Sequence, residues 1–464
     1  MNEYLLPKKV IASDGVIYEN LFVKQELQIG LEEPKTTVFS QNDFVILDFG
    51  VELCGGVRIL TYKAKNISVR IRFGESMSEC CSDLGGEKNA TNDHSLRDFT
   101  VLLQNYSDMS FGQTGFRFVR LDFDGKVEIK SIVAVNQILK KKVRYCYTGN
   151  NERIRAIYET AKRTVDLCAS SGYVWDGVKR DRLVWIGDMA PEVLALTTLY
   201  GRSTEVERSL EYVRRQFPLP MWINSMPAYS LWWIIILADY YERIGARAFV
   251  SHQLSYLLGL IEQINGCVDE NGDLHYPSYF VDWPTHGQVD EKAGVRAINI
   301  YAMKRAIWLL REFNRDCSLA ETILDRLLLI EIEVQKSKQV TGLKFFATEL
   351  SETDKKRLVE GGARGMSTFM SYYILKAVAS FDKPHAVEMM KEYYGGMLDK
   401  GATTFWEDFD IEWIENSSRI DELPRNGERD IHGDFGAFCY TGFRHSLCHG
   451  WSAGVIAFIE EECL

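Results

Sequence analysis

The sequence contains no hydrophobic segment of the kind that enters or crosses a membrane. A spanning helix needs about 20 consecutive apolar residues, whereas the longest apolar stretch runs only from Leu231 to Ala238. The N-terminal residues, MNEYLLPKKVIASDG, lack the apolar core of a secretory signal. We therefore expect a protein with no membrane partner, and we expect it in the cytoplasm.

An excess of positive charge and a cysteine framework are also absent. The 464 residues include 54 Lys and Arg against 65 Asp and Glu, for a net charge of −11. A nucleic-acid partner is excluded because a phosphate backbone requires a basic surface. The 10 cysteines form neither a CxxC pair nor a Cys/His cluster with zinc spacing. We expect neither metal nor cofactor, and the sequence leaves the oligomeric state open.

The pattern of apolar residues changes near residue 145. Before it, short β-prone runs alternate apolar and polar side chains and are separated by turns, which predicts an antiparallel β-sandwich over residues 1–145. The clearest runs are Phe44–Phe49, Ser68–Phe73, Phe99–Leu103, Phe116–Phe123 and Ile132–Val135.

After residue 145 the apolar residues recur at helical spacing, in steps of three and four. Helical hairpins with long, aromatic and acidic loops are typical of a closed α/α toroid, which we predict over residues 146–464. The expected helices are Asn151–Cys168, Pro191–Tyr200, Thr204–Gln216, Leu231–Ile244, Val250–Ile264, Ala293–Phe313, Leu319–Ser337, Ser367–Ala379, His385–Tyr394 and Ala453–Glu461.

The segment Trp175–Asp188, WDGVKRDRLVWIGD, concentrates three carboxylates beside Arg180, Trp185 and other large side chains. Indole faces stack on sugar rings and carboxylates accept their hydroxyls, while crowding and burial raise one acid's pKa enough to make it a proton donor. A salt-bridged surface loop is the competing interpretation of the same composition.

Three other segments carry similar side chains. Gly401–Asp410 (GATTFWEDFD) is either an acidic site or a capped helix start. Phe443–Trp451 (FRHSLCHGW) places His445 and His449 four residues apart, but there is no HExxH pattern to indicate a metal. Tyr276–His286 (YPSYFVDWPTH) is either a binding loop or an aromatic cover over helix ends.

Together these segments resemble α-L-rhamnosidases of glycoside hydrolase family 78. Asp176–Asp188 is similar to the family's DCPxRDERLGWxGD, with one residue fewer between Asp176 and Asp181. GATTFWE resembles the family segment GxTTxWE, and HSLCHGW resembles a downstream SxNHxxxG segment in which Cys448 replaces Asn. The strand-like segments LDFGVELCGGV, IRFGE and GFRFVRL also resemble the family's N-terminal sandwich.

The resemblance implies a β-sandwich followed by an (α/α)6 barrel and inverting hydrolysis of a terminal α-L-rhamnose or related sugar. In this chain Asp181 takes the place of the acid, normally a Glu, and Glu407 takes the place of the base. The implied sugar-binding residues are Asp176, Arg180, Trp185, Asp188, Tyr229, Trp232, Trp283 and His449.

Asp181 is one methylene shorter than the family's Glu, and this leaves two alternatives. Either Glu291 or Glu192 is the proton donor, or the protein is a catalytically weak relative that only binds carbohydrate. The altered pocket also allows a different deoxy or uronic sugar.

Overall fold

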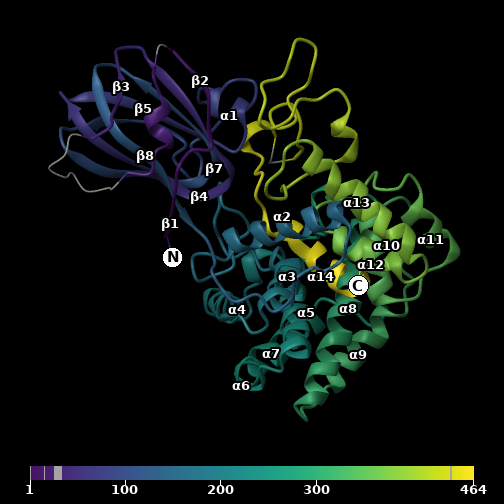
Figure 1. The fold of residues 1–464 in the computed structure, drawn as a ribbon. Helices are drawn as coiled ribbons and strands as arrows, with labels where there is room; N and C mark the ends of the chain where they lie inside the picture. Colours follow the sequence, from purple (N-terminus) through teal and green to yellow (C-terminus); the bar gives the residue numbers. More distant parts are fainter. Residues whose placement is uncertain (1, 15, 26–33, 439–440, 464) are drawn as a thin grey trace.

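The computed structural model describes residues 2–14, 16–25, 34–438 and 441–463. The N-terminal region, residues 2–137, is an antiparallel sheet, and the helical region, residues 152–463, follows it (Figure 1). The change from strand to helix falls in the connection 138–151, where we also propose the domain boundary at residue 145. None of the described helices is long and apolar enough to cross a membrane.

Hydrogen bonds connect the strands of the N-terminal region into one sheet of order β1-β8-β4-β7-β5-β6, with β2 on β4 and β3 on β8. Each of the five predicted strands lies inside an observed one. The strands are β1 Asn2–Leu5, β2 Lys9–Ser13, β3 Thr37–Phe39, β4 Phe44–Ala64, β5 Ile67–Gly74, β6 Asp98–Leu103, β7 Ser107–Phe123 and β8 Val127–Gln137, with the short helix α1 (Met77–Cys81) after β5.

The long strands β4 and β7 explain how a single sheet encloses a core. Residues 44–48 of β4 pair with β2 and with the end of β7, whereas residues 55–64 pair with β8 and with the start of β7. Side chains from both halves, such as Leu47 and Ile59, belong to one buried cluster. The β4–β7 pair therefore passes from one layer to the other, and the predicted antiparallel architecture is confirmed.

The helical region consists of helices joined by loops of very different lengths. The helices are α2 Glu152–Cys168, α3 Met189–Tyr200, α4 Thr204–Gln216, α5 Pro227–Ile244, α6 Arg247–Ser251, α7 Leu254–Asn265, α8 Glu291–Glu312, α9 Ser318–Leu327, α10 Lys338–Ala347, α11 Glu352–Val359, α12 Ser371–Ala379, α13 Lys383–Asp399 and α14 Val455–Glu462. α3 packs on α5, α5 on α8, α8 on α10, α10 on α12, α12 on α14, and α14 again on α3.

Two helix predictions are wrong in detail. The helix expected over Leu319–Ser337 ends at Leu327, and the one expected over Val250–Ile264 is divided between α6 and α7. Two observed helices, α10 and α11, are not predicted. α10 contains Gly342, which lowers helix propensity. A Cβ at Gly342 would lie 3.0 Å from the backbone of Ile374 in α12. The glycine therefore permits the close approach of two helices, which local propensity does not register.

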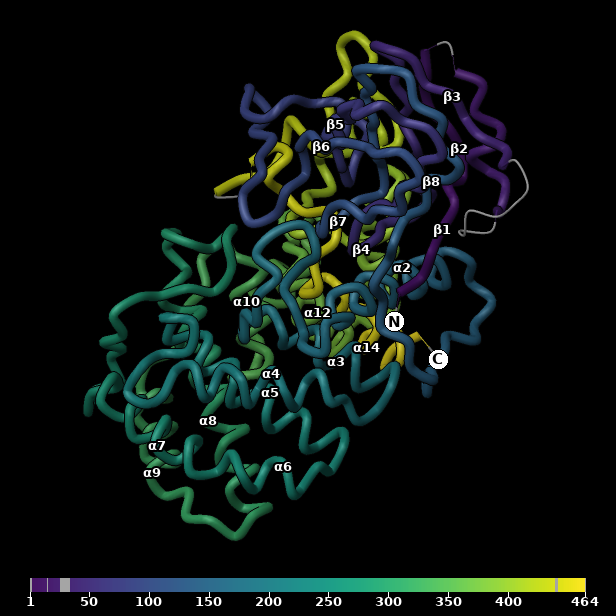
Figure 2. Tube along the Cα trace, turned by 90° about the vertical axis from the view of Figure 1, so that its left-hand side faces the viewer, coloured from purple at the N-terminus to yellow at the C-terminus, as the bar shows by residue number. Residues whose placement is uncertain are grey.

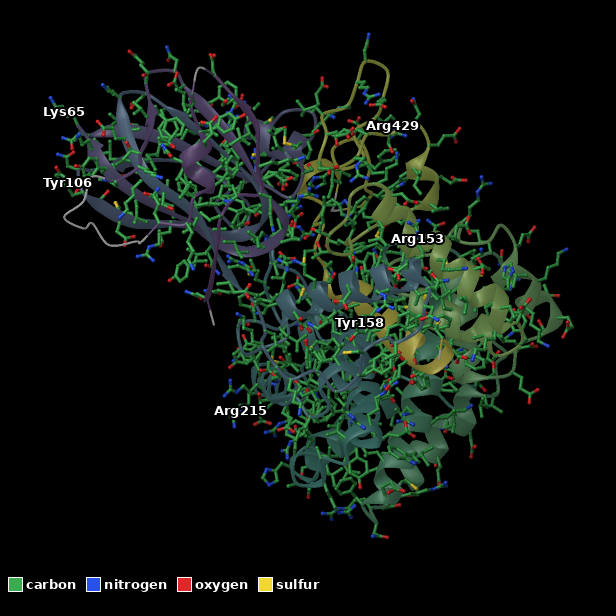
Figure 3. All side chains as sticks on the ribbon, in the orientation of Figure 1. Lys65, Tyr106, Arg153, Tyr158, Arg215 and Arg429 are labelled. Atoms are coloured by element: carbon green, nitrogen blue, oxygen red, sulfur yellow. The ribbon has the colours of Figure 1, made fainter. Side chains whose placement is uncertain are left out.

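Between α13 and α14 the chain makes an excursion, described over 400–438 and 441–454, that lies beside the N-terminal region (Figures 1 and 2) and returns to pack on α2 and α3 through Gly450–Gly454. Figure 3 shows Arg429 on this excursion, far from Arg153 on α2. Met77 N–H donates to the Ile420 carbonyl at 2.8 Å, and Ser76 Oγ lies 2.7 Å from His432 Nδ1. The N-terminal region thus holds the excursion that carries two of the candidate site segments.

Candidate active site

Three segments that resemble the family motifs meet through their backbones. Gly450 N–H donates to the Asp176 carbonyl at 2.7 Å, and His449 N–H donates to the Phe405 carbonyl at 2.9 Å. Glu407 N–H donates to the Ser446 carbonyl at 2.9 Å. Segments far apart in the chain are therefore fixed against one another by obligatory backbone hydrogen bonds.

A single guanidinium joins the two candidate catalytic carboxylates. Arg180 donates from Nη1 to Asp181 Oδ2 at 2.9 Å and from Nη2 to Glu407 Oε1 at 2.6 Å. Because one planar guanidinium spans both contacts, these two oxygens lie within the upper limit of about 9.5 Å for inverting glycosidases. The structure thus brings the Asp181 and Glu407 carboxylates together on the two sides of one guanidinium.

Glu407 is buried and held at several atoms. Its Oε2 accepts the Ser446 N–H at 3.0 Å, and its backbone carbonyl accepts the Trp451 indole N–H at 2.9 Å. Burial raises the pKa of Glu407, while the charge of Arg180 and the Ser446 N–H oppose that rise by favouring the carboxylate. His449 Nε2 lies 3.5 Å from Oε1 of the same carboxylate.

Asp188 and Asp176 form a second acidic pair beside the first. Asp188 Oδ1 accepts the Tyr229 hydroxyl at 2.7 Å, and Asp176 Oδ1 accepts the Leu183 N–H at 2.9 Å. Burial raises the pKa of Asp188 to about 7, and the charge of Glu407 adds to the rise. Burial also raises the pKa of Asp176 well above its usual range. Both side chains lie in a poorly solvated environment that suits binding of sugar hydroxyls.

These groups surround a cavity of about 360 Å³, a volume within the usual range for small-molecule sites. Its walls come from the segments that lead into α3, α5, α8 and α14, because these loops gather at one end of the helix ring. The lining residues are Asp176, Asp181, Trp185, Asp188, Met226, Tyr229, Ser278, Tyr279, Phe280, Trp283, His286, His449 and Trp451.

A smaller cavity adjoins the first and includes Glu407. Trp283 and Trp451 line both cavities. Asp181 lines the larger cavity and Glu407 the smaller one, and Glu407 Oε1 lies 3.5 Å from Nε2 of His449, which lines the larger cavity. The two carboxylates thus line adjoining cavities.

One predicted sugar-binding residue is wrong. Trp232 does not line either cavity. It is fully buried in α5, and its ring packs against Phe369 and Tyr373 in the hydrophobic core. Arg180 is also absent from the lining of both cavities, because its guanidinium is engaged by the two carboxylates.

Neither of the alternative proton donors reaches the larger cavity. Glu192 lies behind Gly450, where an added Cβ would be 1.4 Å from its Oε1. Glu291 contacts His286 Nδ1 at 2.7 Å and lies one residue layer away from the cavity. Among the residues that the sequence did not single out, Met226 carried no signal, whereas Ser278, Tyr279 and Phe280 belong to the aromatic segment YPSYFVDWPTH.

Within the described ranges, Glu75, Glu79 and His432 have potential metal-ligand atoms that all lie within 4.8 Å of one another. Lys179 Nζ lies 2.8 Å from Glu79 Oε1 and 3.6 Å from Glu75 Oε2. The buried ammonium supplies the positive charge that two buried carboxylates require. We therefore assign the cluster to the contact between the two regions and infer no metal.

No family model and no curated protein matches the sequence. Among solved structures, a rhamnosidase from Klebsiella oxytoca with rhamnose bound matches over 100% of this chain and 96% of its own, with a TM-score of 0.76 at 20% identity. The chain has the rhamnosidase fold.

Two further rhamnosidases are similar over most of this chain. A family 78 rhamnosidase from Bacillus sp. GL1 gives a TM-score of 0.72 at 16% identity, covering 95% of this chain and 48% of that one. An α-L-rhamnosidase from Streptomyces avermitilis, complexed with L-rhamnose, gives a TM-score of 0.65 at 14% identity, and the match covers 98% of this chain and 43% of that one. This chain thus spans about half the length of these two. The resemblance expected from the motifs is confirmed in the fold.

Proposed function

We propose that this protein is a glycoside hydrolase that removes terminal α-L-rhamnose or a related sugar from oligosaccharides or glycosides. The observation that carries the proposal is the pair Asp181 and Glu407, bridged by Arg180 beside a cavity lined by carboxylates and tryptophans. The rhamnosidase fold supports it, and two of the similar solved structures have rhamnose bound.

The proposed reaction inverts the anomeric centre. Asp181 donates its proton to the glycosidic oxygen, while Glu407 takes a proton from the water that attacks the opposite ring face. The charge of Arg180 and the Ser446 N–H favour the ionised form that a base needs. We also propose that the ring of packed helices from α3 to α14 is an (α/α)6 barrel.

The remaining site residues are proposed to bind the sugar. Asp176 and Asp188 accept hydroxyl groups, Trp185 and Trp283 stack on the ring, and Tyr229 and His449 hold the acidic pair. A uronate would bring another carboxylate into a cavity already lined by acids, at a Coulombic cost. The lining therefore favours a neutral sugar over a uronic one.

A second candidate, a carbohydrate-binding relative with little activity, is favoured by one observation. Arg180 holds both carboxylates directly, and Asp181 adopts a left-handed backbone with φ of 52°. A proton donor so restrained and shorter than Glu has little freedom to approach a glycosidic oxygen. In that case the site binds sugar without cleaving it.

The test is to assay p-nitrophenyl glycosides of rhamnose, other deoxy sugars and a uronic acid with wild type, Asp181→Asn and Glu407→Gln. The exposed Glu412 in the same excursion supplies the control Glu412→Gln. We expect rhamnoside cleavage that falls at least a hundredfold in Glu407→Gln, falls less in Asp181→Asn because p-nitrophenolate leaves with little need of a proton, and does not fall in the control. Rhamnose binding by calorimetry without any cleavage would favour the second candidate, and cleavage unaffected by Asp181→Asn would remove that residue from the acid role.

A further inference from the structure

A histidine from the N-terminal region reaches the candidate proton donor. His94 lies between α1 and β6, and its Nδ1 is 2.9 Å from Asp181 Oδ1. Arg180 holds the other oxygen, Oδ2, at the same distance. Each oxygen of the Asp181 carboxylate therefore has a separate nitrogen partner, and one of the two partners belongs to the other structural region.

The backbone on both sides of this contact is strained. His94, Asp181 and Arg182 have φ values of 63°, 52° and 53°, in the left-handed region that residues other than glycine rarely adopt. Arg182 holds the two segments together by donating to the His94 carbonyl at 3.2 Å and to the Gln113 carbonyl at 2.9 Å. Strain of this kind persists only where surrounding contacts enforce it, and it concentrates at functional sites.

His94 also connects Asp181 to solvent. Its Nε2 lies 3.3 Å from Asp93 Oδ1, and the other oxygen of Asp93 accepts from Arg444 Nη2 at 2.6 Å. The side chains of Asp93 and His94 are 40% and 38% exposed, whereas that of Asp181 is 14% exposed. The three groups form a continuous line from the surface to the cavity.

We propose that His94 is a positioning residue that orients Asp181 and returns a proton to it after each turnover. The proposal rests on the hydrolase function and on Asp181 as its acid. After Asp181 has given its proton to the glycosidic oxygen, the imidazole accepts a proton from water or Asp93 at Nε2 and releases the Nδ1 proton to Oδ1. The neutral ring is regained as its other tautomer, and exchange with water restores the first.

Several titratable groups surround this line. Asp181 shares the lining of the cavity with Asp176 and Asp188, and Arg180 links it to Glu407. Arg180 is the opposing cation on Asp181, and Asp93 faces the imidazole from the solvent side. Imidazole changes its protonation near neutral pH, which makes histidine suitable for such transfer.

The test separates hydrogen bonding from proton transfer by changing His94 to Asn and to Ala. Asn tolerates a positive φ and keeps an N–H donor for Asp181, but it cannot pass a proton on. His275 supplies the matched control His275→Asn. Its Nε2 lies 2.8 Å from Asp269 Oδ2, and it does not line the cavity. Each variant is assayed with a p-nitrophenyl glycoside and with an alkyl glycoside, whose poor leaving group needs the proton.

We expect His94→Asn and His94→Ala to lower kcat on the alkyl glycoside about tenfold to a hundredfold, with a smaller loss on the p-nitrophenyl substrate. Added imidazole should partly restore His94→Ala, and His275→Asn should match wild type. Wild-type kinetics in His94→Asn, with an active wild type, would overturn the relay while leaving the hydrolase function intact.

A readout that does not depend on cleavage tests the pairing itself. In protein labelled with 15N-histidine, Asp181→Asn should move the Nδ1 resonance of His94, assigned by its loss in His94→Asn, and leave that of His275 in place. An unmoved His94 resonance would overturn the pairing. A wild type that cleaves no glycoside would overturn the proposed function and the relay together.

Discussion

Removing one buried acid should stabilise this protein at neutral pH. Glu192 on α3 is fully buried, and neither of its carboxyl oxygens has a hydrogen-bond partner among the described residues. Burial raises its pKa well above the usual 4.5, and the charges of Asp188 and Asp176 add to the rise. The folded protein therefore holds this proton to a higher pH than the unfolded chain does.

The sign and size of the effect follow from this difference. Below pH 4.5 both states hold the proton, and above it only the folded state does, so the free energy of unfolding falls as pH rises. Each pH unit over which only the folded state holds the proton lowers the free energy of unfolding by about 1.4 kcal/mol. Glutamine has nearly the same volume and does not ionise. Glu192→Gln should recover most of that free energy at pH 7 and almost none at pH 4.

Urea unfolding of wild type and Glu192→Gln at pH 4, 5.5 and 7, followed by circular dichroism, measures this difference. Glu159 on the exposed face of α2 supplies the control Glu159→Gln, for which we expect no comparable gain. A stabilisation of equal size at every pH would mean that ionisation is not its cause. A variant that is less stable than wild type at pH 7 would show that the Glu192 carboxylate is charged and paired, refuting the reasoning.

Three other changes probe the site and the contact that supports it. Tyr229→Phe removes the hydrogen bond to Asp188 and should weaken rhamnose binding about tenfold, or about 1.4 kcal/mol, measured by calorimetry; unchanged affinity would show that this bond does not organise the pocket. Gly187→Ala should weaken binding more than Tyr229→Phe, because its Cβ would lie 2.4 Å from the Tyr229 ring and displace it; an affinity equal to wild type would contradict that geometry. Lys179→Met leaves the buried carboxylates of Glu75 and Glu79 without a cation. It should lower the free energy of unfolding by about 3 kcal/mol, measured by urea unfolding at pH 7. A loss below 1 kcal/mol would show that these acids are protonated.

Local sequence pattern was sufficient for much of the secondary structure. Thr204–Gln216 is predicted at the bounds observed for α4, because its apolar residues follow a helical period. In the structure Ser203 caps its first turn. The same rules missed α10, where Gly342 is present because α12 packs closely against it. A helix whose composition is decided by its neighbour is not visible to a local rule.

Site prediction divides in the same way. Asp181 and Glu407 were identified from their motifs, and the fold brings them together through Arg180. Trp232 was misplaced because a helix that is apolar on every side gives no indication of which tryptophan faces a cavity. His94 lies in a loop without any motif, so nothing in the sequence linked it to Asp181.

The sequence by itself determined the change from strands to helices near residue 145 and the identity of the acidic and aromatic segments, because periodicity and composition are local properties. Tertiary structure alone decided that one guanidinium joins Asp181 to Glu407 and that the N-terminal region contributes His94 to the site. These contacts depend on the path of the excursion between α13 and α14 and on the packing of two regions. Hydrogen bonds and burial between distant segments, rather than residue order, place those side chains.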